Sequence, residues 1–330
     1  MLSRKNILIT DRFAQEALLT LEQQSFLQVS RSANYDLEFE NLENTHALII
    51  RSRTKITDKI LSRAKKLQLI ITATSGFDHI DLEAAKKWGI TVMYTPEANK
   101  HSAAQLTWSL ILACSNKILE AHRSTKSGEW NRDLLVGLEL EKKTIGIVGL
   151  GRIGKRVSEI AHSFDMDVIA YDPYIEEKDF TQAGAERVAF EELLKRSDIL
   201  TFHVPATAET KRMLHRSHYE YINRGIIIIN TSRGNVLDEN DLCDTLEKGW
   251  IGAVGLDVYE KEPLSRNSKL LQMNNCILTP HIGANTTEAF QKASEQAALK
   301  TIQFFIDGST SDTLPPKSGW YGAQPPFQDR

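Results

Sequence analysis

Residues 144–161 read TIGIVGLGRIGKRVSEIA, an apolar run followed by three glycines and then by a helical pattern. The glycines Gly149, Gly151 and Gly154 have the spacing G-x-G-x-x-G. Between a strand and a helix, the first glycine permits a tight turn and the second lets the backbone approach a pyrophosphate. The third lets the helix pack on the strand, and the helix N-terminus faces the phosphate charge. The stretch therefore predicts a dinucleotide-binding βα unit.

An acidic residue, Asp172, follows at the end of the next apolar run, in VIAYDPY (168–174). A carboxylate at this place can accept hydrogen bonds from the adenosine ribose hydroxyls, and it would repel a 2′-phosphate. The next residues, Pro173 and Tyr174, offer no cation to hold such a phosphate. The sequence therefore favours NAD over NADP as the cofactor.

Apolar, β-rich runs alternate with helical patterns along the whole chain, which predicts an α/β fold with parallel sheets. We expect strands at 6–10, 26–30, 47–52, 67–75 and 91–95, and then at 144–151, 167–173, 198–205, 225–234, 252–259 and 276–282. These form two doubly wound parallel-sheet domains. A Rossmann NAD-binding domain at 99–287 is predicted to be inserted in a flavodoxin-like substrate domain made of 1–98 and 288–330.

The bulk composition excludes several classes of function. The 330 residues carry a net charge of −3, without the clustered basic face that nucleic-acid binding requires. No apolar run approaches the roughly 20 residues of a membrane span, and the N-terminal run is too short for a signal peptide. The three cysteines are far apart and have no metal-ligand spacing. We therefore expect a cytoplasmic protein with free thiols and no metal, nucleic-acid or membrane partner.

Three charged or titratable residues follow apolar runs of the second series, namely Arg233, Glu262 and His281. Ligands of open α/β sheets bind beyond the carboxyl ends of the strands. An arginine can hold a carboxylate and a carbonyl oxygen, a histidine can exchange a proton near neutrality, and a carboxylate can orient that histidine. Each residue alone is more simply explained as structural or solvated. Together, after a nucleotide turn, they predict oxidation of a 2-hydroxy acid.

The order of the motifs resembles one known family. VGLGRIG, YDP, HVP, NTSRG, GLDVYEKEP and TPHIGANT follow RSRTKIT and ATSGFDHIDLEAAKKWGI. Over about residues 5–310 the chain resembles the D-isomer-specific 2-hydroxyacid dehydrogenases. Within that family it is most similar to the short enzymes that oxidise D-3-phosphoglycerate and lack an added regulatory domain. The resemblance implies a homodimer that associates through the NAD-binding domain.

The resemblance also implies roles for particular residues. Arg233 would bind the substrate carboxylate and carbonyl, and Glu262 would pair with the acid/base His281. Ser75 and Gly76 would hold the substrate carboxylate, with Asn99 beside the active site. The cofactor contacts would fall on Gly149, Gly151, Arg152, Ile153, Gly154, Asp172, His203, Pro205, Thr231, Ser232 and Asp257.

The substrate depends on Arg51 and Arg53, which would meet a phosphate and so favour D-3-phosphoglycerate. The alternative is that one or both arginines are solvated or paired with acids. The chain would then be a reductase of hydroxypyruvate, glyoxylate or another small 2-keto acid. A third possibility is an NAD-sensing regulator, because transcriptional corepressors resemble this family and keep its catalytic residues.

Overall fold

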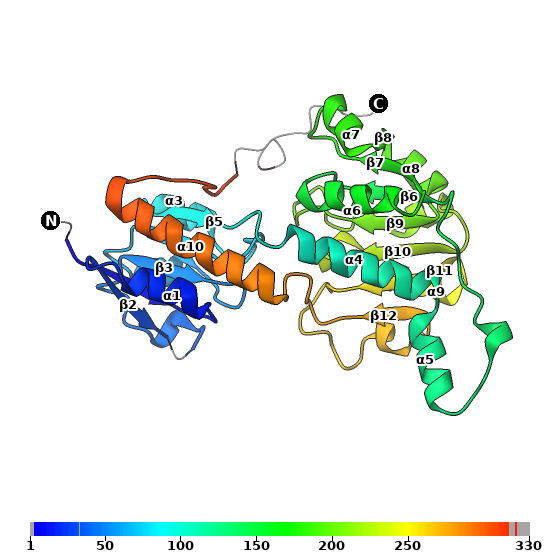
Figure 1. The fold of residues 1–330 in the computed structure, drawn as a ribbon, viewed down its shortest axis with the longest axis horizontal. Coiled ribbons are helices and arrows are strands. Elements are labelled where there is room, and N and C mark those ends of the chain that lie inside the picture. Colours follow the sequence, from blue (N-terminus) through cyan, green and yellow to red (C-terminus); the bar gives the residue numbers. More distant parts are fainter. Residues whose placement is uncertain (1–2, 33, 317–320, 322–330) are drawn as a thin grey trace. The chain divides into compact units, whose positions relative to one another are not determined.

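The computed structural model describes residues 3–32, 34–316 and 321, which form two compact α/β units (Figure 1). The first unit combines the described residues up to Asn99 with those from Asn285 onward. The second unit extends from Lys100 to Ala284 and is inserted between the two parts of the first. The predicted α/β fold with two parallel sheets is therefore confirmed.

The first unit contains a parallel sheet whose strands lie in the order β2-β1-β3-β4-β5. This 2-1-3-4-5 order is the flavodoxin-like arrangement. Its strands, within the described residues, are β1 (Lys5–Ile9), β2 (Leu27–Arg31), β3 (Ala47–Ile50), β4 (Leu69–Thr72) and β5 (Thr91–Tyr94).

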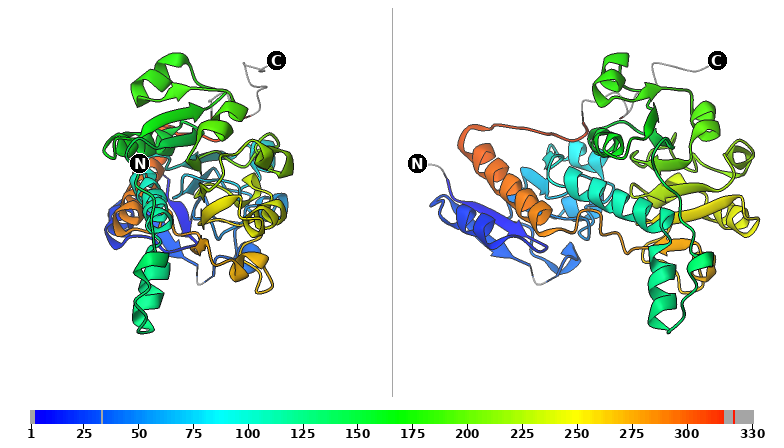
Figure 2. Two further views of the ribbon diagram at one scale, coloured as in Figure 1. Left: turned by 90° about the vertical axis from the view of Figure 1, so that its right-hand side faces the viewer. Right: turned by 45° about the vertical axis from the view of Figure 1, so that its right-hand side comes forward.

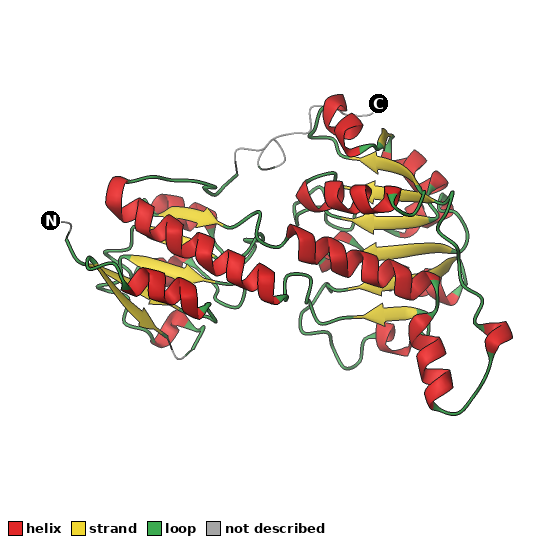
Figure 3. Cartoon of the chain, in the orientation of Figure 1, coloured by secondary structure: helices red, strands yellow, loops and turns green. Residues whose placement is uncertain are grey.

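Helices cover both faces of this sheet (Figure 3). They are α1 (Gln15–Glu22), α2 (Asp58–Leu61), α3 (Leu82–Lys87) and α10 (Thr287–Asp307), with a 3₁₀ turn η1 (Leu37–Phe39). Alternate strand residues face opposite layers: Ile7 and Ile9 pack in the core with Ala297 of α10, whereas Leu8 packs in the core with Leu61 of α2. Both cores exclude water, which explains why the strands are almost wholly apolar.

The second unit contains a larger parallel sheet in the order β12-β11-β10-β9-β6-β7-β8. Read from its other edge, the order β8-β7-β6-β9-β10-β11 is the Rossmann order 3-2-1-4-5-6, and β12 is the added strand. The strands are β6 (Thr144–Val148), β7 (Asp167–Tyr171), β8 (Glu186–Arg187), β9 (Ile199–Phe202), β10 (Ile226–Asn230), β11 (Ile251–Leu256) and β12 (Cys276–Leu278). The sequence did not predict β8, because two charged residues give no apolar run.

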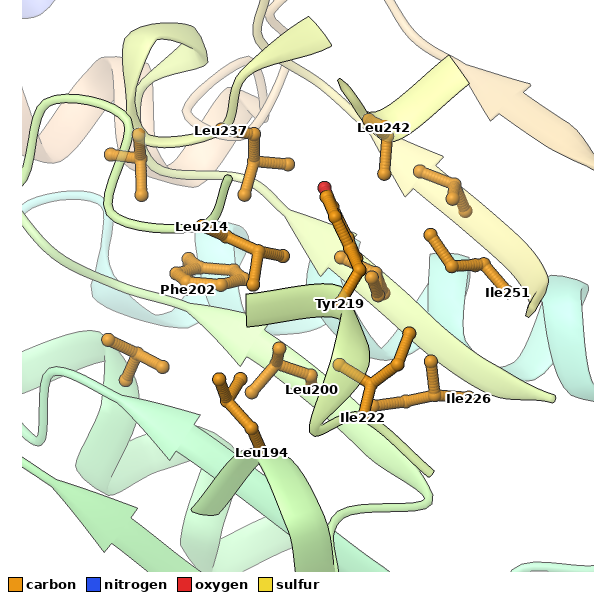
Figure 4. Close-up of a cluster of buried hydrophobic side chains, with 14 of the residues drawn as sticks. Leu194, Leu200, Phe202, Leu214, Tyr219, Ile222, Ile226, Leu237, Leu242 and Ile251 are labelled. Carbon is orange, nitrogen blue, oxygen red and sulfur yellow. The ribbon is translucent and has the colours of Figure 1, made fainter. Parts of the chain in front are cut away.

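The helices of the second unit also lie on both faces of its sheet (Figure 3). They are α4 (Lys100–Ser115), α5 (Ile118–Lys126), α6 (Arg152–His162), α7 (Glu177–Ala183), α8 (Phe190–Arg196) and α9 (Glu239–Glu247). Short 3₁₀ turns are η2 (Arg132–Leu134), η3 (Arg216–Glu220), η4 (Gly234–Val236) and η5 (Lys269–Gln272). On one face Phe202, Tyr219 and Leu242 belong to a buried cluster that supports β9, β10 and β11 (Figure 4).

One part of the second unit stands away from its sheet. Figure 2 shows α5 and the segment after it extending outward from the end of α4. None of the helices in the described part of the chain has both the length and the apolarity needed to cross a membrane.

Candidate active site

The three strand-end residues follow neighbouring strands. Arg233 comes three residues after β10, Glu262 follows β11 and His281 follows β12, and these strands are adjacent in the sheet. Because parallel strands end at the same edge, the topology brings the three side chains to one place. The predicted strands were too long here. Strand β11 ends at Leu256 rather than at 259, so Glu262 lies in a loop instead of directly at a strand end.

His281 and Glu262 form a direct pair. The distance between His281 Nδ1 and Glu262 Oε2 is 2.7 Å, and the two side chains are 46% and 37% exposed. The second carboxylate oxygen of Glu262 accepts the backbone N–H of Tyr259 at 3.2 Å. Both oxygens are thus held, and the pairing at Nδ1 leaves His281 Nε2 as the ring atom that can exchange a proton with a ligand.

Electrostatics favours the ionised form of Glu262. Partial burial acts to raise the pKa of this carboxyl, whereas the hydrogen bond and charge of His281 lower it. The Tyr259 N–H and the positive charge of Arg233 act in the same direction, so the pKa of Glu262 lies below its usual range. A permanent negative charge beside the ring stabilises an imidazolium.

Arg233 is positioned by the tight turn that follows β10. The fully buried Asn230 accepts hydrogen bonds from the N–H and hydroxyl of Ser232 and donates to the carbonyl of Arg233 at 2.9 Å. At Gly234, a Cβ would lie 1.8 Å from the carbonyl carbon of Tyr259, so the turn packs directly on the backbone that precedes Glu262. The sequence NTSRG thus fixes Arg233 relative to the Glu262 loop.

The His281 turn is held by Asp257, which is completely buried. One oxygen of Asp257 accepts the Ile282 N–H (2.8 Å) and the Thr279 hydroxyl (2.6 Å), and the other accepts the Gly283 N–H (2.8 Å). His281 itself has φ +54°, a left-handed conformation that costs energy for a residue with a side chain. The buried carboxylate therefore maintains the backbone conformation that presents the imidazole.

The glycine-rich turn has the geometry that a pyrophosphate requires. Gly149 has φ +88°, and a Cβ on Gly154 would lie 2.2 Å from the carbonyl oxygen of Gly149. By contrast, a Cβ on Gly151 would meet nothing within 4 Å. The space beside Gly151 is thus open, and the turn leads directly to the N-terminus of α6, where Arg152 and Ile153 begin the helix. The residues fit a dinucleotide phosphate at this end of α6.

Asp172 lies directly after β7 and is tied to the same turn. Its carboxylate accepts the N–H groups of Leu150 and Tyr174, each at 3.0 Å. Burial raises the pKa of Asp172, and these two hydrogen bonds oppose that rise. Because a carboxylate offers about four acceptor positions, two remain for the ribose hydroxyls of NAD.

The remaining predicted cofactor residues lie at the ends of β9 and β10. His203 follows β9, where desolvation lowers its pKa to about 3 and keeps the ring neutral beside the Thr201 hydroxyl (3.0 Å). Pro205 accepts the Thr210 hydroxyl through its carbonyl (2.6 Å). The hydroxyl of Thr231 lies 2.8 Å from that of Thr107 in α4. These contacts set the shape of the sheet edge beside the glycine turn.

The predicted substrate residues Arg51, Arg53, Ser75, Gly76 and Asn99 all belong to the first unit. The arginines follow β3, and Ser75 and Gly76 follow β4, so they share one edge of that sheet. The Thr74 hydroxyl donates to the carbonyl of Gly76 at 2.7 Å. Asn99 is the last residue of this part of the unit.

The two arginines differ in their surroundings. The Arg53 guanidinium pairs with the Asp11 carboxylate, which is the acid-paired alternative for this residue. The Nη1 atom of Arg51 is buried and has no hydrogen-bond partner within the described residues. Burial lowers the pKa of Arg51; Asp11 opposes this effect, whereas the charges of Arg12 and Arg53 add to it.

Sequence reasoning missed Tyr259 and Arg12, which both contribute to these sites. Tyr259 holds Glu262 through its backbone, and its hydroxyl donates to the carbonyl of Thr279 (2.8 Å). The Arg12 guanidinium lies 5.3 Å from the centroid of the Phe290 ring, and the Arg51 guanidinium lies 5.2 Å from the same ring. Arg12 comes three residues after β1, and this position was an available signal, since β1 and β3 are neighbours. No group of three metal-ligating side chains occurs in the described ranges.

A Rossmann unit with a phosphate turn and an imidazole–carboxylate pair at its strand ends is typical of dinucleotide-dependent dehydrogenases. Residues 108–283 match the family described as "D-isomer specific 2-hydroxyacid dehydrogenase, NAD binding domain". The chain therefore belongs to the D-isomer-specific 2-hydroxyacid dehydrogenase family, and NAD is the cofactor of its second unit.

Individual relatives agree with this assignment. D-3-phosphoglycerate dehydrogenase of Methanocaldococcus jannaschii is 38% identical over 93% of this chain and 59% of the relative. Hydroxypyruvate reductase of Thermotoga maritima is 38% identical over 92% of this chain and 99% of the relative. The crystal structure of Aquifex aeolicus D-lactate dehydrogenase with NAD and lactic acid is 30% identical, covering 92% of this chain and 96% of that one, with a TM-score of 0.81.

Lengths differ among these relatives. The chain spans little more than half the length of the curated D-3-phosphoglycerate dehydrogenases that it matches. It spans nearly the whole of the hydroxypyruvate reductase.

Proposed function

We propose that this protein oxidises D-3-phosphoglycerate to 3-phosphohydroxypyruvate with NAD, a reaction that would feed serine synthesis in the cytoplasm. The observation that carries the proposal is the 2.7 Å pair of His281 and Glu262, close to Arg233 in a family NAD-binding domain. In this proposal the first unit is the substrate domain, made of 1–98 and 288–330, and the NAD-binding domain is 99–287.

The chemistry assigns one task to each residue. NAD, held by the glycine turn and Asp172, would supply the acceptor for the hydride that leaves C2 of the hydroxy acid. His281 removes the hydroxyl proton through Nε2, while its Nδ1 remains on Glu262. The charge of Glu262 stabilises the imidazolium that results. Arg233 binds the substrate carboxylate and the oxygen that becomes the carbonyl, because its fork of donors matches two oxygens.

The cofactor contacts are proposed to be Gly149, Gly151, Arg152, Ile153, Gly154, Asp172, His203, Pro205, Thr231, Ser232 and Asp257. The open space beside Gly151 supports the pyrophosphate position. The fully buried Asp257 supports a position near the nicotinamide, since its carboxylate adjoins the His281 turn.

The choice of a phosphorylated substrate depends on the cations of the first unit. The charges of Asp11, Arg12 and Arg53 all act on Arg51, and Arg53 already pairs with Asp11. The buried Nη1 of Arg51 has no hydrogen-bond partner among the described residues, which supports an anionic ligand there, because a buried donor without an acceptor is costly. Ser75 and Gly76 are proposed to hold the substrate carboxylate, with Asn99 beside them.

The test is a substrate panel with both cofactors. We expect NADH to form with D-3-phosphoglycerate and to be consumed with 3-phosphohydroxypyruvate, with much less activity when NADP replaces NAD. Arg51→Met should reduce kcat/KM for the phosphorylated acid, and Leu299→Met on α10 is the matched control. Turnover that is equal with and without the substrate phosphate would reject the phosphate assignment.

A second candidate is a reductase of hydroxypyruvate, glyoxylate or a similar acid. The near-complete coverage of the Thermotoga maritima hydroxypyruvate reductase favours it. Good turnover of these acids, with none of the phosphorylated pair, would establish this alternative. Negligible turnover of every 2-keto acid, with capture of transcription factors, would instead indicate the NAD-sensing regulator.

We also propose that the protein is a homodimer that associates through the NAD-binding domain. Apolar side chains in the segment after α5 support this, since Trp130, Leu134 and Val136 are 77%, 75% and 70% exposed. Exposed apolar groups that gather on one projecting segment are typical of a protein interface.

The free thiols of Cys114, Cys243 and Cys276 fit a reducing cytoplasm.

A further inference from the structure

The segment after α10 is bound to the edge of the first sheet. Tyr94 donates its N–H to the carbonyl of Asp312 (3.1 Å), and Leu314 donates its N–H to the carbonyl of Val92 (2.8 Å). Thr313 forms an antiparallel bridge with Met93. Leu314 is 9% exposed and packs in the core on that side of the sheet. The segment thus extends the sheet beyond β5.

A buried lysine fixes the start of this segment. Lys300 in α10 is 8% exposed, and its ammonium donates to the carbonyl of Tyr94 (2.5 Å) and to the Asp312 carboxylate (2.6 Å). A buried ammonium is costly without such partners, so these contacts tie Asp312 to both α10 and β5. The chain therefore leaves α10 along a defined path.

Further along, an aromatic side chain of the same segment reaches the loop after β4. The ring of Tyr321 lies 6.1 Å from that of Phe77, tilted by 59°. Phe77 in turn meets Tyr94 edge to face, at 5.8 Å and 82°. Three rings, from the C-terminal segment, the loop and the end of β5, are thus packed together.

Phe77 directly follows Gly76 in the loop at 74–80. Other contacts also hold this loop: Ile56 donates its N–H to the carbonyl of His79 (2.9 Å), and the Thr74 hydroxyl donates to the carbonyl of Gly76 itself (2.7 Å). The packing of Tyr321 on the ring of Phe77 is one contact between the C-terminal segment and the loop. Movement of that ring would move the neighbouring backbone of Gly76.

We propose that the C-terminal segment, residues 309–316 with Tyr321, is a strap that positions the substrate loop. The packing of Tyr321 on Phe77 holds the backbone N–H groups of Ser75 and Gly76 where they meet a substrate carboxylate. The assignment of this loop to the substrate rests on the proposed function. Tyr321 is a positioning residue, because it acts through Phe77.

The test uses the full chain with Tyr321→Ala, Tyr321→Phe and, as a matched control, Tyr221→Ala. Tyr221 is 41% exposed and lies in the second unit. We expect Tyr321→Ala to accelerate hydrogen exchange at residues 74–80 and to raise KM for the acid about three- to tenfold. The kcat should stay the same, since the bound substrate and the transition state lose the same contact. The Kd for NADH should also stay the same. Tyr321→Phe keeps the ring and should match the unaltered protein.

Each other outcome overturns part of the proposal. Unchanged exchange in Tyr321→Ala would reject the strap, and faster exchange with an unchanged KM would reject its effect on substrate. A Tyr321→Phe variant as impaired as Tyr321→Ala would reject ring packing as the cause. A chain that turns over no 2-hydroxy acid would reject the proposed function, and hydrogen exchange alone would then decide whether the strap holds the loop.

Discussion

At the scale of single residues, the pair of His281 and Glu262 gives the sharpest kinetic prediction. Glu262→Gln removes the charge that stabilises the imidazolium but keeps a side chain of the same size. The rising limb of the oxidation rate against pH should then move, because a protonated ring loses its counter-charge. Rate–pH profiles measure this, with His281→Ala as the inactive reference that still binds NADH. A limb that does not move would contradict the pairing.

The lowered pKa of Glu262 also links stability to pH. A carboxyl whose pKa is lower in the folded state contributes stability above its unfolded pKa of about 4.3, and loses it as pH falls through the folded pKa. Glu262→Gln has no such proton to bind. Thermal unfolding from pH 7 down to pH 3 should therefore show a smaller acid-side decrease of Tm in the variant. Parallel curves would show that the pair does not contribute.

Asp257 should be required for the conformation of the His281 turn. In Asp257→Asn the side-chain NH2 group replaces one of the two accepting oxygens. It must then face the N–H of either Ile282 or Gly283, so that two buried donors point at each other without an acceptor. The expected cost is about 1–3 kcal/mol of unfolding free energy. The amides of Ile282 and Gly283 should exchange faster, and kcat should fall. Denaturant unfolding and hydrogen exchange measure these effects; unaltered exchange at both amides would refute the role of the carboxylate.

At the scale of elements, two glycines of one turn should behave in opposite ways. Gly154→Ala places a Cβ 2.2 Å from a backbone oxygen, so α6 must move, at a cost of about 1–3 kcal/mol in stability. Gly151→Ala meets no protein atom within 4 Å and should leave Tm unchanged. It should weaken NADH binding by about tenfold, because the methyl group enters the space proposed for the pyrophosphate. A Gly151→Ala variant with normal affinity would contradict that position.

The sequence predicted the elements better than their ends. Apolar periodicity located nearly every strand, because buried parallel strands are apolar on both faces. The strand ends were overestimated because residues such as Ala73 and Thr231 continue the β-type composition into the loops. The charged β8 gave no apolar signal. Likewise, the ion pair of Arg53 and Asp11 joins residues far apart in the sequence, and only the adjacency of β1 and β3 brings them together.

At the scale of the whole molecule, the proposed dimer gives the last prediction. Light scattering should report twice the chain mass of 37.2 kDa. The double variant Trp130→Glu, Leu134→Glu should shift the protein toward monomer, because both side chains are highly exposed on the projecting segment and the charges would have to be desolvated at an interface. Leu299→Glu is the matched control, since Leu299 is 52% exposed in the other unit, and it should remain dimeric. NADH affinity in the double variant should be retained, because the glycine turn and Asp172 lie on other elements. A double variant that keeps the dimer mass would place the interface elsewhere.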